Sequence, residues 1–248
     1  MWMNSHWPEI LRFFLAAFVV FVLPFVDIRE ARRMRDDPAE WRRLRFYRST
    51  VALLWLLAVL AFAATGLGIL QVPHGAQARW IFGGPVRFWV VAALAATYFG
   101  LGLAPGAVCL AKPAKRAAYT RAMKSLSFLL PGSQRERAWF ALVSVSAGVC
   151  EELIFRGFLL GLLRSELAMG LTLAWVVSSV IFGINHLYQG KAGVMRSTVA
   201  GAALGLMAIL SGGLVLPMLL HCVADLQILV MYRPEPRLKL TQMEAVSG

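Results

Sequence analysis

The sequence predicts an all-α fold, a polytopic transmembrane helical bundle of about seven to eight spans. The 248 residues are 59% hydrophobic and 15% charged, and their mean hydropathy is +0.66. This apolar share is well above that of ordinary soluble domains. The charged residues are also confined to a few blocks between long apolar runs, whereas a soluble fold would need polar residues throughout its surface.

Seven apolar runs approach the roughly 20 residues that an α-helix needs to cross a bilayer. They cover residues 9–27, 50–71, 88–110, 138–161, 168–187, 196–211 and 214–232. The amphipathic segment 117–130 is expected to lie in the membrane interface, with an eighth, partial crossing as the alternative. No repeat or long linker divides the chain, so one membrane domain is expected over residues 1–248.

The net charge of +12 is distributed unevenly along the chain. Eight arginines fall within residues 29–48 and seven lysines or arginines within residues 112–137, and the last run is followed by Arg233, Arg237 and Lys239. The alternate loops have few, chiefly Arg79, Arg87 and Arg164. This positive-inside pattern predicts a plasma or inner membrane protein with its N-terminus outside and its C-terminus in the cytoplasm. It favours contact with anionic lipid at the cytoplasmic face, and we expect no nucleic-acid partner.

Polar residues within the apolar runs occur in three places. The fourth, fifth and seventh runs contain, in order, Glu151, Glu152 and Arg156; Asn185 and His186; and His221 and Asp225. A charged group at the centre of a membrane helix costs a few kcal/mol, about 3 on insertion scales, and usually faces the bundle interior. We therefore expect these residues to form one shared site.

Helix spacing assigns partners within this set. Glu152 and Arg156 are four residues apart, with the acid first, which favours an ion pair. Glu151 lies about 100° round the helix and is left free for another role. His221 and Asp225 are also four residues apart, so Asp225 could accept from a ring N–H of His221 and fix its tautomer.

A carboxylate and two imidazoles in a secluded cavity can activate water. The carboxylate acts as a general base, one histidine orients the water, and the other stabilises the oxyanion of a tetrahedral intermediate. This combination describes peptide-bond hydrolysis without a covalent intermediate. The same residue types could instead bind zinc through two histidines and a glutamate, although the sequence has no HExxH motif. Phe182 precedes His186 by four residues and is expected to pack on its ring.

Three motifs resemble the CPBP family of CAAX prenyl endopeptidases and bacteriocin-processing or Abi proteins. They are EELIFR (151–156), FGINH (182–186) and HCVAD (221–225), within a family-like core at about 138–232. The resemblance implies an intramembrane glutamate-type endopeptidase, which is a hydrolase. We expect it to need no metal or other cofactor, with zinc left as the alternative. It implies catalytic roles for Glu151 as the base, His186 as its partner, and His221 with Asp225 on the oxyanion side. It implies supporting roles for Glu152, Arg156, Phe182 and Asn185.

The substrate stays open at this point. Members that cleave prenylated proteins usually have asparagine where this chain has Asp225, and an aspartate donates a hydrogen bond only when protonated. We expect a membrane-embedded or lipidated peptide or protein. Two other functions are open: a non-catalytic scaffold or immunity-type binding protein, and a proton-coupled transporter. No symmetry-related pair of Gly/Pro-broken spans favours the transporter.

The predicted depths of the site residues require a cavity. At the helical rise, Glu151 lies about 20 Å from the cytoplasmic end of its helix and His221 about 10 Å from the outer end. His186 is expected close to the inner end. The three meet only if a cavity runs from the cytoplasmic face to mid-membrane, or if helices tilt or break. We predict that cysteines introduced at these positions are labelled from the cytoplasmic side; labelling from the outer side alone would contradict this.

Overall fold

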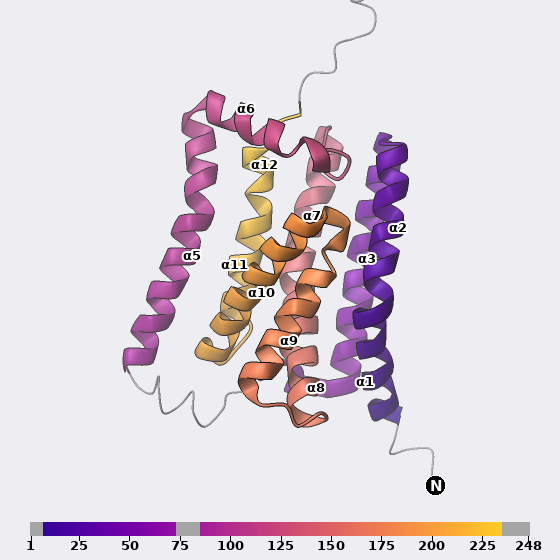
Figure 1. Ribbon diagram of the computed structural model, residues 1–248, viewed down its shortest axis with the longest axis vertical. Coiled ribbons are helices and arrows are strands. Elements are labelled where there is room, and N and C mark those ends of the chain that lie inside the picture. Colours follow the sequence, from indigo (N-terminus) through magenta and orange to yellow (C-terminus); the bar gives the residue numbers. More distant parts are fainter. Residues whose placement is uncertain (1–6, 73–84, 235–248) are drawn as a thin grey trace, which may run out of the picture.

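The computed structural model describes residues 7–72 and 85–234, which form helices and connecting turns without β-strands. Arg79, Arg237 and Lys239 of the charge pattern lie outside the described residues. The helical segments, shown in Figure 1, are α1 (Trp7–Ala17), η1 (Phe18–Val22), α2 (Leu23–Asp36), α3 (Glu40–Thr65), η2 (Gly66–Leu70), α5 (Pro85–Ala111), α6 (Pro113–Ala122), η3 (Lys124–Leu126), α7 (Gln134–Glu152), η4 (Leu153–Leu159), α8 (Leu160–Ser165), α9 (Leu171–Ile184), η5 (Leu187–Gln189), α10 (Lys191–Ser211), α11 (Val215–Leu226) and α12 (Ile228–Met231).

The described helices confirm the predicted fold class, an all-helical polytopic membrane bundle. Within the described residues, four continuous helical stretches are long and apolar enough to cross a membrane: Trp7–Asp36, Glu40–Leu70, Gln134–Ser165 and Lys191–Ser211. Shorter apolar helices are Trp89–Tyr98, Leu171–Ile184 and Val215–Met231. Large apolar side chains such as Phe14, Phe25 and Leu101 are exposed on the outside of the bundle, which suits contact with lipid chains.

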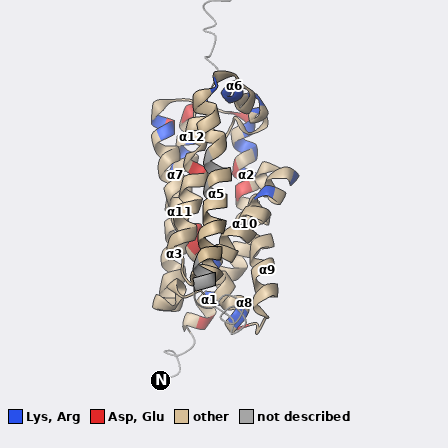
Figure 2. Cartoon of the chain, turned by 90° about the vertical axis from the view of Figure 1, so that its left-hand side faces the viewer, with Lys and Arg blue, Asp and Glu red and all other residues tan. Residues whose placement is uncertain are grey.

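The helix α6 lies across one end of the bundle (Figure 1). It has ten residues and no buried side chain, and at 1.5 Å per residue it is about 15 Å long, too short to span. The predicted interfacial position of segment 117–130 fits this geometry, and α6 is not an eighth crossing. The basic segments 29–48 and 112–137 lie at this same end, called here the basic end (Figures 1 and 2). Its orientation toward the cytoplasm stays a prediction.

The α9–α10 hairpin stops short of the basic end. In Figure 1 the turn between these two helices lies below the level of α6. The expectation that His186 lies close to the inner end of the bundle is therefore wrong, because α9 has only 14 residues before the chain turns back. The two helices pack closely at Gly183, where a Cβ would lie 2.8 Å from the carbonyl oxygen of Val194.

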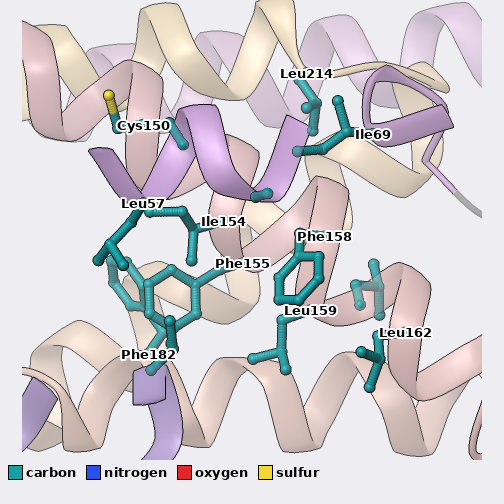
Figure 3. Close-up of a cluster of buried hydrophobic side chains, with 14 of the residues drawn as sticks. Leu57, Ile69, Cys150, Ile154, Phe155, Phe158, Leu159, Leu162, Phe182 and Leu214 are labelled. Carbon is teal, nitrogen blue, oxygen red and sulfur yellow. The ribbon is translucent and has the colours of Figure 1, made fainter. Parts of the chain in front are cut away.

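The apolar core surrounds the π-helix η4, which follows Glu152 directly. Ile154, Phe155 and Phe158 are buried there, and they pack in a cluster with Leu57 of α3 and Phe182 of α9 (Figure 3). A π-helix is rare and occurs often at functional sites because its wider turn redirects side chains. A run of six buried residues, Ile154–Leu159, thus begins two positions after Glu152.

The helices α7 and α11 pack closely because Gly148 has no side chain. A Cβ at Gly148 would lie 2.4 Å from the sulfur of Cys222 and 2.7 Å from its backbone nitrogen. Glu152 lies one turn beyond Gly148, and His221 is the neighbour of Cys222. The missing side chain therefore lets a carboxylate on one helix reach an imidazole on the other.

We predict that Gly148→Val separates α7 from α11. Overpacking of this kind lowers the free energy of unfolding by about 1–3 kcal/mol, measured as thermal unfolding of the purified protein in detergent. Gly161→Ala is the matched control, because a Cβ at that helical glycine meets no atom within 4 Å. Equal stability of the two variants would contradict the close contact.

Candidate active site

The carboxylate of Glu152 is the centre of the polar cluster. Arg156 Nη1 donates to Glu152 Oε1 over 2.9 Å, so the predicted ion pair is present. Both side chains are buried, and that of Glu152 is 0% exposed. Arg156 Nη2 also donates to the carbonyl oxygen of Gly201 in α10 over 2.9 Å. The guanidinium is therefore held by an acid on its own helix and by backbone of another.

The ring of His221 is held by Glu152 and not by Asp225. Its Nδ1 lies 2.8 Å from Glu152 Oε1, so an Nδ1–H donates to the same oxygen that binds Arg156. Asp225 Oδ2 is 3.8 Å from His221 Nε2, beyond hydrogen-bond length. The expectation that Asp225 fixes the tautomer of His221 is wrong, because the close contact of α7 and α11 brings a nearer carboxylate to the ring.

The Nε2 atom of His221 faces two further carboxylates. Glu151 Oε2 lies 3.9 Å from it, about as far as the oxygen of Asp225. The side chain of Glu151 is 17% exposed and that of Asp225 is 37% exposed, whereas the side chain of Glu152 is fully buried. Glu151 is therefore the more exposed glutamate of the EE pair, although its Oε2 atom is itself buried.

Phe182 connects the two histidines. Its ring centroid is 4.8 Å from that of His186, as the spacing predicted, and 5.9 Å from that of His221. The guanidinium carbon of Arg156 lies 4.5 Å from the same centroid, a cation–π contact that spacing along one helix does not reveal. The Nδ1 atom of His186 is 2.8 Å from the carbonyl oxygen of Phe182. No ion pair within 4.0 Å joins His186 to Glu151 among the described residues.

Three buried acceptor oxygens of the cluster have no hydrogen-bond partner among the described residues. They are Glu151 Oε2, Glu152 Oε2 and Asn185 Oδ1. Asn185 is anchored at its other end, because its Nδ2 donates to the carbonyl oxygen of Ile181 over 2.9 Å. Buried polar atoms are almost always paired, and exceptions are typical of sites that bind a donor during function.

Two contributors to the cluster were missed by sequence reasoning. Gly201 of the GAALG segment offers its carbonyl to Arg156, and a Cβ there would lie 2.9 Å from the Phe182 ring. Asp27 of α2 interacts electrostatically with Glu151 and with Tyr188, whose ring stacks on His186 at 6.0 Å. The signal available for Asp27 was an acidic residue at the end of the first apolar run.

A cavity of about 1650 Å³ opens at the basic end, but none of the predicted site residues lines it. This cavity is therefore not the predicted one that reaches the histidines from the basic end, and that cavity stays a prediction. The described residues contain no cluster of three His, Cys, Asp or Glu side chains that could hold a metal ion.

The fold and the cluster define a class of protein, a helical membrane protein with a buried carboxylate–histidine site between its helices. Residues 133–227 match the family described as type II CAAX prenyl endopeptidase Rce1-like. This match confirms the resemblance to the CAAX protease family that the three motifs predicted.

The chain is also similar to an Escherichia coli protein described as an uncharacterized 24.3 kDa protein. The two are 29% identical over 178 residues, which cover 71% of this chain and 75% of that protein. No solved structure matches the chain significantly.

We predict that Glu152→Ala destabilises the protein. Removal of this carboxylate leaves Arg156 buried without its counter-ion, a change that costs about 3–5 kcal/mol in other proteins, measured as unfolding in detergent. The control is Glu30→Ala, which removes the acid of a surface pair with Arg33 and is expected to cost about 0–1 kcal/mol. An inactive Glu152→Ala protein as stable as the control would reverse the roles given to Glu151 and Glu152.

Proposed function

We propose that the protein is an intramembrane endopeptidase that cleaves a membrane-associated protein or peptide with a water molecule activated by glutamate and histidine. The observation on which the proposal rests is the position of His221 Nε2, which faces Glu151 and Asp225 at 3.9 and 3.8 Å while Glu152 holds Nδ1. The match of residues 133–227 to an endopeptidase family supports the same reaction class.

In this mechanism Glu151 removes a proton from water as the water oxygen attacks the carbonyl carbon of the scissile peptide. The Oε2 atom of Glu151 suits this role, since it has no partner among the described residues. Glu151 then returns the proton to the leaving nitrogen as the C–N bond breaks. The Nδ1 atom of His186 is hydrogen-bonded to the carbonyl oxygen of Phe182, and the Phe182 ring contacts the rings of both His186 and His221. We assign His186 to the binding of the water molecule.

His221 is assigned to the oxyanion of the tetrahedral intermediate. As an imidazolium it donates from both nitrogens, with Nδ1–H directed to Glu152 and Nε2–H available to the oxyanion. Asp225, at 3.8 Å from Nε2, supports the charged ring without competing for its proton at hydrogen-bond length. Because Glu152 already sets the ring orientation, the contribution of Asp225 is electrostatic.

The substrate class proposed is a membrane-embedded or lipidated peptide, in the plasma or inner membrane, with the basic end toward the cytoplasm. The buried position of the cluster among apolar helices favours substrates that enter from the bilayer over soluble ones. Asp225, which stands where the prenyl-protein members usually have asparagine, leaves both prenylated and unprenylated peptides as candidates.

We predict that Glu151→Gln abolishes cleavage of a reporter from a library of membrane peptides while the protein stays folded. The amide has nearly the shape of the carboxylate but cannot accept the proton, so we expect a loss of at least about 100-fold, the lower range for general-base catalysis. His221→Ala should lose as much, and Asp225→Asn should keep partial activity. Phenanthroline should leave the wild-type rate unchanged if water is activated by Glu151 alone.

Glu30→Gln, at an exposed position of α2, is the control for the loss of one acid. A Glu151→Gln variant that cleaves at the wild-type rate would contradict the mechanism. Absence of cleavage by the wild type, with binding of membrane peptides that Glu151→Gln retains, would instead indicate a non-catalytic scaffold. Loss of activity with phenanthroline and recovery with zinc would indicate metal-dependent hydrolysis.

A further inference from the structure

The cavity of about 1650 Å³ at the basic end is separate from the candidate active site. The first turn of α3, the segment from α6 to α7 and the end of α12 contribute to its lining. The cations that line it are Arg35, Arg43, Arg116, Lys124, Arg137 and Arg233. Two carboxylates, Glu40 and Glu136, also line it, so positive charge is in excess.

Both carboxylates already have partners. Glu136 is 0% exposed, forms an ion pair with Arg43, and accepts from the backbone nitrogen of Ser133 over 2.9 Å. Glu40 accepts from the hydroxyl of Ser133 over 2.8 Å. Both carboxylates therefore make contacts that join the start of α3 to the start of α7. Among the cations that line the cavity, Arg43 is the one that they neutralise in a buried ion pair.

The other five cations of the cavity have no carboxylate within 4.0 Å among the described residues. Two of them are fixed without loss of charge. Arg35 lies over the Phe128 ring at 4.7 Å, and Arg137 donates to the carbonyl oxygen of Leu229. A set of held guanidinium groups without counter-ions suits a phosphate, which accepts paired N–H groups from arginine.

The same cavity has an apolar wall formed by Leu110, Leu130, Leu229 and Val230. Leu110 belongs to the last turn of α5 and Leu229 to α12, and both helices reach the basic end of the bundle (Figure 1). A ligand that fills the whole cavity would combine an anionic group with an apolar part. Anionic phospholipids combine these two parts, and their headgroups lie at the membrane surface, where basic pockets can bind them.

We propose that this cavity binds the phosphate group of an anionic ligand, with a membrane phospholipid or a soluble phosphate as the source. The proposal does not depend on the endopeptidase reaction, because none of the catalytic candidates lines the cavity. Arg116 and Arg233 are the groups best suited to test it, because neither side chain takes part in a described ion pair and removal of their charge leaves the Arg43–Glu136 pair intact.

The test compares two double variants of the full chain, purified in detergent, that lose the same charge at the same end. Arg116→Gln/Arg233→Gln removes two cations of the cavity, and Arg121→Gln/Arg135→Gln removes two exposed cations that do not line it. The probes are dioctanoyl phosphatidic acid, dioctanoyl phosphatidylcholine and inorganic phosphate. Binding is measured by native mass spectrometry and calorimetry.

We expect the wild type to bind the phosphatidic acid more tightly than the zwitterionic lipid. The cavity variant should bind the anionic lipid about 30-fold more weakly, because each of the two lost cations is expected to contribute a factor of about 5.5 to the affinity. The control should change less than about threefold. Displacement of the lipid by inorganic phosphate would identify the phosphate group alone as the ligand, and failure to displace it would identify the lipid as the source.

Three results would overturn the proposal. One is equal weakening in the cavity variant and the control, which indicates general attraction to a basic surface. Another is equal affinity for the anionic and zwitterionic lipids. The last is no binding of either phosphatidic acid or inorganic phosphate to the wild type. Peptidase activity is not a readout, so failure here is distinct from failure of the proposed function.

Discussion

The Glu152 carboxylate is shared between Arg156 and His221, at 2.9 and 2.8 Å from one oxygen atom. Taking charges out of water into an apolar bundle is costly, and the cost is offset only when each charge has a close partner. One oxygen here joins α7, η4 and α11, and Arg156 extends the network to α10 through Gly201. The segments α7, η4, α10 and α11 are consequently fixed relative to one another by a single buried polar network.

Packing of small residues makes this network possible. Gly148 lets α11 approach α7, and Gly201 lets Phe182 and Arg156 approach α10. The short α9 then ends at mid-depth in the bundle, which places His186 between the helices instead of at the basic end. The polar groups meet because helices of unequal length pack closely, and no cavity from the basic end is needed to join them.

The chain before the matched segment also contributes to the site. Helix α3 packs against α7 and η4, with Leu57 in the apolar cluster around the π-helix (Figure 3). Helix α2 packs against η5 and carries Asp27, whose carboxylate is close enough to Glu151 for their charges to interact. At the basic end, the buried Arg43–Glu136 pair joins α3 to α7 a second time. The match to the endopeptidase family covers residues 133–227, yet the surroundings of its EE pair come partly from α2 and α3.

The sequence by itself determined the class of fold, the positions of the apolar helices and the polar residues that cluster, because hydropathy and i,i+4 spacing are local properties of the chain. The Glu152–Arg156 pair and the Phe182–His186 contact follow from spacing on one helix and were predicted on that basis. The hydrogen-bond partner of His221 was not predicted correctly. Spacing favoured Asp225, four residues away on the same helix, whereas the actual partner, Glu152, is 69 residues away in sequence. Only the tertiary structure decides between them, because the distance between two helices depends on the side chains that separate them, and here Gly148 has none.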